Sequence, residues 1–442
     1  MAKYLHHRKA NLSLIELIAI AVGGMVGGGI FSILGIAASL IGFLTPLAII
    51  LGGLIAMIAA YAYVKLGVYY KDEGATYAFI KRTFPKDRIF ASVIGWFVVF
   101  GYISTLSLYA YTFASYAISN THFADNIWIR KAVAWTILLV FMTINLISVK
   151  GMGRIEDLMV YTKMILLFFV SVLLITHGET SFKTFIEQMI RDVENSTALQ
   201  ILIVSSVTFV AYEGFQLVIN AVNEMTNPDK NIPRAIYGAI ITVIIIYVVL
   251  ATGALFSIPI QNLIHDKEYA LAAGASKVIG KPGEWLVIFS ALLATSSAIS
   301  GTVFGSSHQM ASIAEDGYMP RFLAKRNQNN IPYVAIISMT FFASMLILIG
   351  GLRLILEFGS VTFLLVSLLV AYTNYKIKNK TNSSTFLAIG AIAGLGIGTI
   401  LILYFEATHK PEQMIFIISL YIILAIAAFL FGKKLKKSKE SM

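Results

Sequence analysis

Twelve long apolar runs follow one another along the chain, and they restrict its fold more than any other feature. Each has about 20 mostly apolar residues or more, the length that an α-helix needs to cross the hydrocarbon core of a bilayer. Open sheet edges are excluded there because lipid offers no partners for unpaired backbone groups. The sequence therefore predicts an all-α membrane protein with spans at residues 13–42, 46–66, 89–119, 129–149, 154–176, 198–224, 234–257, 283–315, 332–350, 353–374, 385–405 and 413–432.

The composition fits a chain that is surrounded by lipid. Hydrophobic residues make up 58% of the 442 residues and charged residues 13%, whereas soluble domains carry about 25% charged residues. The chain has no cysteine, which excludes disulfides and thiolate metal sites, and its seven histidines are scattered. The net charge of +11 falls in short loops between the runs. We therefore expect no metal, no cofactor and no nucleic-acid partner.

The distribution of Lys and Arg predicts the orientation of the chain. Twelve spans place both termini on one side of the membrane, and that side carries 24 of the 34 Lys and Arg residues against 9 on the other side. Because positively charged loops stay in the cytoplasm, we expect both termini there and the chain in the cytoplasmic membrane. On the same side, residues 74–82 are amphipathic and predict a short helix on the cytoplasmic surface.

Two of the runs are interrupted near their midpoints. The stretch "GGMVGGGIF" at residues 23–31 interrupts the first run, and "FVAYEGFQ" at residues 209–216 places a charged residue and a glycine in the sixth. Interruptions five spans apart indicate the inverted 5+5 repeat of a secondary transporter, whose site lies where the two breaks meet. The predicted parts are a cytoplasmic tail (1–12), a first repeat (13–176), a second repeat (198–374), two further spans (385–432) and a basic cytoplasmic tail (433–442).

A broken membrane helix offers groups that suit a zwitterion. The first half ends in carbonyls and the second half begins with N–H groups, which match an ammonium and a carboxylate. Glycine lets a ligand approach the backbone, so bulky residues at Gly27, Gly28 or Gly29 would fill that space. Small residues spaced by four also let membrane helices pack closely, and glycine spacing alone does not separate these interpretations. The second break favours a binding site.

The two interrupted stretches resemble a known family. "GGMVGGGIF" resembles its first-span signature, G-[STA]-G-[IV]-F, and "YEGFQLVINAVNEMTNPDKNIPRAI" at residues 212–236 resembles its sixth span and the following loop. The family is the amino acid–polyamine–organocation superfamily of transporters. The resemblance covers nearly the whole chain. It implies the LeuT-like fold, with twelve transmembrane helices, broken helices 1 and 6, a 5+5 inverted repeat and two C-terminal helices.

The resemblance also implies a substrate site. The backbone N–H groups of Gly28 and Gly29 would hold the substrate carboxylate. The carbonyls of Met25, Val210 and Glu213 would hold its ammonium. Side chains from several spans would shape the pocket, among them Phe209, Val210, Tyr102 and Phe358.

Lys163 lies inside the fifth run. It is roughly two and a half helical turns, about 14 Å, into the span, which is deep for snorkelling to the interface. A lysine inside a membrane is costly and typical of function. The stretch "GRIEDLMVYTK" at residues 153–163 is similar to proton-coupled amino acid transporters that carry a lysine in span 5. That similarity implies an ammonium in place of a sodium ion, in contact with the Gly23 carbonyl and with Ser296 and Ser297.

Glu213 allows two interpretations. In the first, structural interpretation its side chain faces a polar vestibule or pairs with a neighbouring cation. In the second it binds a cationic side chain of the substrate. We favour the structural role. The choice bears on whether the substrate is a neutral or a cationic compound.

The expected function is secondary active transport of amino acids by alternating access, as a proton-coupled, sodium-independent symport. Amino acid, protons and lipid are the expected partners, and no catalytic residue is assigned, so we do not expect an enzyme. An amino acid or polyamine exchanger is the alternative, and a non-transporting receptor or channel is an alternative of another class. No channel filter and no phosphate-binding loop of the G-x-x-x-x-G-K-[ST] type stands out. The substrate, the direction of flux and the oligomeric state stay open.

Overall fold

The computed structural model describes residues 12–147, 152–178, 180–266 and 269–440, with side chains for all of these except 152–157 and 434–440. Within these residues the chain is helical, and its one extended pairing is an isolated bridge between Leu12 and Met225. The predicted N-terminal tail before Leu12, and the side chains of the basic tail after Lys433, lie outside the described residues. The all-α fold class that the apolar runs predict is confirmed.

In chain order, the elements are α1 (Leu14–Met25), α2 (Gly29–Ile41), η1 (Gly42–Leu44), α3 (Thr45–Tyr70), α4 (Ala75–Thr83), α5 (Arg88–Ile118), α6 (Ile127–Ile147), α7 (Met152–Thr176), α8 (Phe182–Asn195), α9 (Ala198–Thr208), η2 (Phe209–Tyr212), α10 (Leu217–Asn220), α11 (Pro228–Ser257), α12 (Ile260–His265), α13 (Ala270–Ile279), α14 (Lys281–Glu315), η3 (Arg321–Ala324), α15 (Tyr333–Ile349), α16 (Leu352–Lys376), α17 (Thr385–His409) and α18 (Pro411–Glu440).

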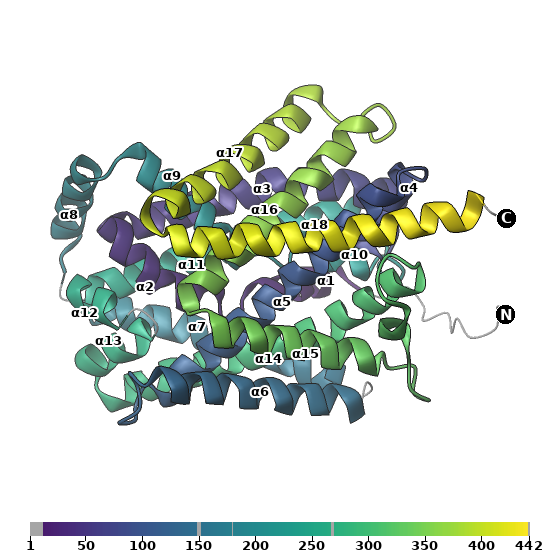
Figure 1. Cartoon of the computed structure of the whole chain (residues 1–442). Coiled ribbons are helices and arrows are strands. Elements are labelled where there is room, and N and C mark those ends of the chain that lie inside the picture. Colours follow the sequence, from purple (N-terminus) through teal and green to yellow (C-terminus); the bar gives the residue numbers. More distant parts are fainter. Residues whose placement is uncertain (1–11, 148–151, 179, 267–268, 441–442) are drawn as a thin grey trace.

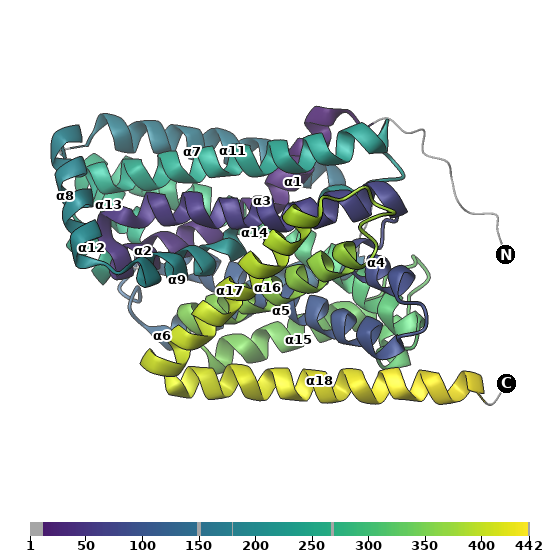
Figure 2. The same cartoon turned by 90° about the horizontal axis from the view of Figure 1, so that it is seen from above.

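The long helices lie side by side in one bundle (Figures 1 and 2). The start of α1 and the end of α18 lie at one end of this bundle, which we call the termini end, and α4 lies there too; α8, α12 and α13 lie at the opposite end. Inside the bundle, α5 contacts α14, α16 and α18, whereas α11 contacts α1, α3 and α7. Large apolar side chains such as Trp135, Phe168 and Ile400 are exposed on the outer helices. Such a surface suits lipid rather than water.

Ten segments of the described chain are long and apolar enough to cross a membrane. Each of the twelve predicted spans falls on helical segments of the structure. The two counts differ because α1 and α15 are short apolar helices, and because α2 and α3 follow one another as a single apolar segment, Gly29–Tyr70. The chain is a multi-pass membrane protein, and twelve crossings stay a prediction.

The first break lies between α1 and α2. The backbone leaves the helical conformation at Val26, where ψ is 79°, and α2 begins at Gly29. In a continuous helix the N–H of Gly27 would donate to the carbonyl of Gly23. In this protein it donates instead to the carbonyl of Met25 at 2.9 Å. The break therefore leaves the Gly23 carbonyl available for another donor.

The second break lies between η2 and α10. Glu213 is extended, with φ −67° and ψ 135°, and Gly214 has φ 126°. A side chain rarely adopts that φ, so glycine fits the position. A Cβ atom at Gly214 would also lie 2.6 Å from the carbonyl carbon of Gly24 and 2.8 Å from the nitrogen of Met25. The two breaks therefore touch backbone to backbone, as the pairing of interrupted spans predicts.

The short helix predicted at residues 74–82 is present as α4, but its predicted place on the surface is wrong. The residues from Ala75 to Ile80 are buried, and α4 contacts α5 and α16. Just beyond α14, the carboxylate of Asp316 accepts hydrogen bonds from the Tyr77 hydroxyl at 2.8 Å and from the Lys81 ammonium at 2.5 Å. The apolar face of α4 packs against protein.

Three helices were not predicted, namely α8, α12 and α13, which lie in the connections at the end opposite the termini. There α12 and α13 contact α2, the second half of the first span. In α8 the carboxylate of Asp192 accepts the N–H of Phe43 at 2.7 Å. These helices cover the inner elements at that end of the bundle.

Candidate functional site

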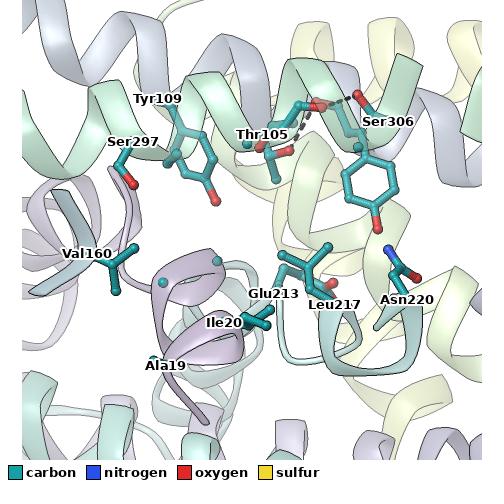
Figure 3. A pocket seen from close by; sticks show the side chains of 18 of the residues that line it. Ala19, Ile20, Thr105, Tyr109, Val160, Glu213, Leu217, Asn220, Ser297 and Ser306 are labelled. Carbon is teal, nitrogen blue, oxygen red and sulfur yellow. Dashed lines mark hydrogen bonds between the residues drawn. The ribbon is translucent and has the colours of Figure 1, made fainter. Parts of the chain in front are cut away.

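A pocket of about 350 Å³ lies where the two breaks meet (Figure 3). Gly23, Gly24, Glu213 and Gly214 line it at the breaks, and its other lining residues come mainly from α1, α5, α7, α10, α14 and α16. The pocket continues past Glu16, at the start of α1, to Leu12, so it extends toward the termini end. Its volume lies in the range of small-molecule sites, about 300–1,000 Å³.

Lys163 lies behind this pocket and is fully buried. Its ammonium donates to the carbonyl of Gly23 at 2.7 Å, the contact that the resemblance implied. That carbonyl belongs to the last turn of α1, where the helix dipole favours a positive charge. Lys163 therefore binds α1 to α7 at the break. Ser297 lines the pocket from α14, whereas Ser296 does not line it.

Glu213 lines the pocket and is 4% exposed. Its Oε2 accepts the side-chain amide of Gln216 at 3.0 Å, whereas Oε1 has no hydrogen-bond partner among the described residues. No Lys, Arg or His of the described residues forms an ion pair with this carboxylate. Of the two structural roles that we expected, the structure therefore places Glu213 on the vestibule and not in an ion pair.

Two tyrosines of α5 form part of the pocket wall. Tyr102 and Tyr109 both line the pocket, and the Tyr109 hydroxyl points into the space between α5 and α1 (Figure 3). The Tyr102 hydroxyl accepts the amide of Gln216 at 3.3 Å. Gln216 thus connects the aromatic wall to Glu213. Tyr102 was predicted from the sequence, whereas Tyr109 and Gln216 were not.

The glycine triplet lies outside the pocket in this conformation. A Cβ atom at Gly27 would lie 2.8 Å from the Cβ of Ala298 and 2.9 Å from the Tyr109 ring, and one at Gly29 would lie 3.0 Å from Ala211. At Gly28 it would lie 3.1 Å from Thr112. The side on which a Cβ would project is therefore filled by protein, as the helix-packing interpretation predicts. The N–H groups of Gly28 and Gly29 donate no backbone hydrogen bond among the described residues.

The other predicted pocket residues are buried near the breaks without lining the pocket. Phe209 and Val210 belong to η2, and Phe358 packs its ring against Tyr421 at a centroid distance of 5.6 Å. The carbonyl of Val210 accepts the N–H of Glu213 at 3.2 Å.

Tyr247 of α11 is a residue at the breaks that sequence reasoning missed. Its hydroxyl lies 2.8 Å from the carbonyl of Met25 and 3.2 Å from that of Ala211, so it bridges the two breaks. With the N–H of Gly27, the Met25 carbonyl already accepts two hydrogen bonds. This carbonyl is therefore occupied in the present conformation. No group of three or more potential metal ligands occurs among the described residues.

Several known proteins are similar to this chain over most of its length. An uncharacterized protein of Methanocaldococcus jannaschii is 28% identical over 98% of this chain and 97% of its own length. The inner membrane transport protein YbaT of Escherichia coli is 27% identical over 87% of this chain and 88% of its own. The branched-chain amino acid permease BcaP of Bacillus subtilis is 23% identical over 88% and 86%.

The sequence profile of the amino acid permease family matches residues 12–432, which is nearly the whole chain. The match includes both broken spans and Lys163. The relatives whose names describe a function are transporters or permeases. The chain therefore belongs to the amino acid permease family, as its resemblance to the amino acid–polyamine–organocation superfamily implied.

Proposed function

We propose that the protein is a secondary active transporter of amino acids across the cytoplasmic membrane, coupled to protons and independent of sodium. The observation that carries this proposal is the contact between the buried Lys163 ammonium and the Gly23 carbonyl at the first break. Membership of the permease family and the names of relatives, such as branched-chain amino acid permease, support an amino acid as the substrate and a transporter rather than an enzyme.

The substrate would bind through its backbone groups at the breaks. Its carboxylate would accept the N–H groups of Gly28 and Gly29 at the start of α2, where the helix dipole favours a negative charge. Its ammonium would donate to carbonyls at the ends of α1 and η2. Because Tyr247 occupies the Met25 carbonyl, we propose that Tyr247 gives up that hydrogen bond when substrate enters.

Lys163 would couple the proton to movement of the first span. A protonated amine donates a charge-assisted hydrogen bond to the Gly23 carbonyl, which is stronger than a neutral one. Loss of the proton would weaken the tie between α1 and α7 and let α1 move. The two inverted repeats, residues 13–176 and 198–374, would then alternate the access to the site. With both termini in the cytoplasm, the pocket at the breaks extends toward the cytoplasmic side.

Uptake into proteoliposomes tests the proposal. Purified protein is reconstituted, a panel of radiolabelled amino acids is offered with an inward proton gradient and no sodium, and wild type is compared with Lys163→Ala. We expect concentrative uptake that needs the pH gradient and is lost in the variant. Lys131→Ala is a matched control, because Lys131 is also buried and also donates to a carbonyl, that of Leu348 at 2.7 Å, away from the pocket.

Other results would change the assignment. Sodium-dependent uptake that survives Lys163→Ala would refute proton coupling through this residue. Uptake only into vesicles preloaded with amino acid would identify an exchanger. Specific binding without any flux would identify a receptor.

A further inference from the structure

The carboxylate of Glu213 is a polar group inside the pocket whose hydrogen-bonding capacity is only half used. Gln216 donates to Oε2, while Oε1 is buried without a partner among the described residues. A buried carboxylate oxygen without a donor costs free energy, and a cation that reaches it would offset that cost. Glu213 therefore has a physical reason to bind a positively charged group.

The charge of the pocket lining agrees with this reason. Glu213 and Glu16 are its charged lining residues, and no Lys, Arg or His of the described chain lines it. The Lys163 ammonium lies behind the lining and donates to the Gly23 carbonyl. The carboxylate of Glu16 accepts the backbone N–H of Ser13 at 2.7 Å at the start of α1, where the pocket extends toward the termini end. A low-dielectric cleft with charges of one sign raises the local concentration of ligands of the opposite sign.

The aromatic wall also suits a cation. Tyr102 and Tyr109 line the pocket together with Phe363, and Tyr109 lies across the pocket from Glu213 of the broken segment (Figure 3). The faces of aromatic rings attract ammonium and guanidinium groups. A cationic group between the rings and Glu213 would meet both kinds of attraction at once.

We propose that Glu213 forms a subsite for a second positive charge on the substrate, so that the substrates are amino acids with a cationic side chain. This inference rests on the proposed function, because the α-carboxylate and α-ammonium of the same molecule bind at the breaks. Glu213 follows η2 directly and lies beside Gly214, so the subsite adjoins the backbone site.

Lysine and norleucine form the matched pair of probes. Their side chains have similar lengths, and only lysine carries the terminal ammonium. Binding of radiolabelled lysine to purified protein in detergent is measured by scintillation proximity, with competition by unlabelled norleucine, and flux of both is measured in proteoliposomes. We expect wild type to bind lysine at least about tenfold more tightly than norleucine, and Glu213→Gln to bring the ratio close to one.

Glu284→Gln is the control for removal of a buried carboxylate from a pocket-lining helix. Glu284 is 8% exposed, accepts the Ser276 hydroxyl at 2.9 Å and does not line the pocket. We expect it to keep the wild-type ratio. Size-exclusion profiles and melting temperatures show that each variant is folded.

Three results separate the possibilities. Equal binding of lysine and norleucine by wild type would refute the cation subsite. An equal loss of both ligands in Glu213→Gln would also refute it, and would assign Glu213 to the α-ammonium. Lysine binding that requires Glu213 but gives no flux would support the subsite while refuting the proposed transport.

Discussion

The hydroxyl of Tyr247 donates to the carbonyl of Met25 at 2.8 Å and lies 3.2 Å from that of Ala211, so one side chain of α11 bridges both broken spans. Tyr247 is fully buried. If the Met25 carbonyl binds the substrate ammonium, as proposed above, the bond would compete with it. The hydroxyl would then have two opposing effects, because it stabilises the empty site and would have to be displaced from it.

Tyr247→Phe should separate these effects. We expect a loss of stability of about 1 kcal/mol, the usual net value of one hydrogen bond, together with tighter substrate binding because the Met25 carbonyl loses one of its two donors. Thermal unfolding in detergent and substrate-binding assays measure the two changes. Tyr237→Phe, on the same helix but away from the breaks, is the control. Weaker binding in Tyr247→Phe would show that the hydroxyl contacts substrate instead.

Gly23→Ala should weaken the contact between Lys163 and α1. A Cβ atom at Gly23 would lie 2.8 Å from Cγ2 of Val160 on α7, so the Val160 side chain or the two helices must shift. We expect a destabilisation of about 1–3 kcal/mol, typical of overpacking, and a loss of pH-gradient-driven uptake. The double variant Gly23→Ala, Val160→Ala removes the clashing methyl groups and should restore both. Failure of this rescue would contradict a steric origin.

Gly214→Ala should be more damaging and should not be rescued by truncating a neighbour. The new Cβ would meet backbone atoms of Gly24 and Met25, and the φ of 126° is unfavourable for any side chain. We expect a loss of at least about 3 kcal/mol, from strain of about 1–3 kcal/mol plus the clash. Expression level and melting temperature report it. Gly394→Ala, where nothing lies within 4 Å, should behave as wild type.

Asp316→Asn should loosen α4 from the end of α14. The Asp316 carboxylate accepts hydrogen bonds from the Tyr77 hydroxyl and the Lys81 ammonium. Burial and the Asp316 carboxylate raise the pKa of Tyr77, so its hydroxyl stays a donor. Because its pKa is raised, the Tyr77 hydroxyl stays protonated in the folded protein at any pH below the ordinary tyrosine pKa, near 10. The stability that its hydrogen bond contributes is therefore complete below that pH and is lost as pH rises through the folded-state pKa. We expect a loss of about 1 kcal/mol that is constant between pH 6 and about 9.

Melting temperatures across that pH range check the prediction. Asp229→Asn is the matched control, because its ion pair with Lys71, at 2.9 Å, is exposed at both side chains and should contribute little. A similar loss in both variants would contradict the special role of Asp316.

The sequence predicted the long helices and both breaks because a bilayer leaves few alternatives. Apolar runs must be helical there, and glycines or a carboxylate inside a run indicate an interruption. The partner of Lys163 followed from resemblance. Periodicity could not identify Tyr247, because an aromatic residue in an apolar span looks the same whether it faces a break or lipid. Nor could it show that the glycine triplet packs against α5, α14 and η2, since that depends on how distant segments meet.

The contact between Gly24 and Gly214 has a mechanical consequence. A second tie joins the same two segments at the termini end, where the N–H of Leu12 donates to the carbonyl of Glu224 at 3.0 Å. The first half of span 1 and the second half of span 6 are thus in contact at the breaks and joined by a hydrogen bond at the termini end. In the proposed transport cycle α1 and α10 would therefore move together, and the contact between Gly24 and Gly214, two residues without a side chain, would be their pivot.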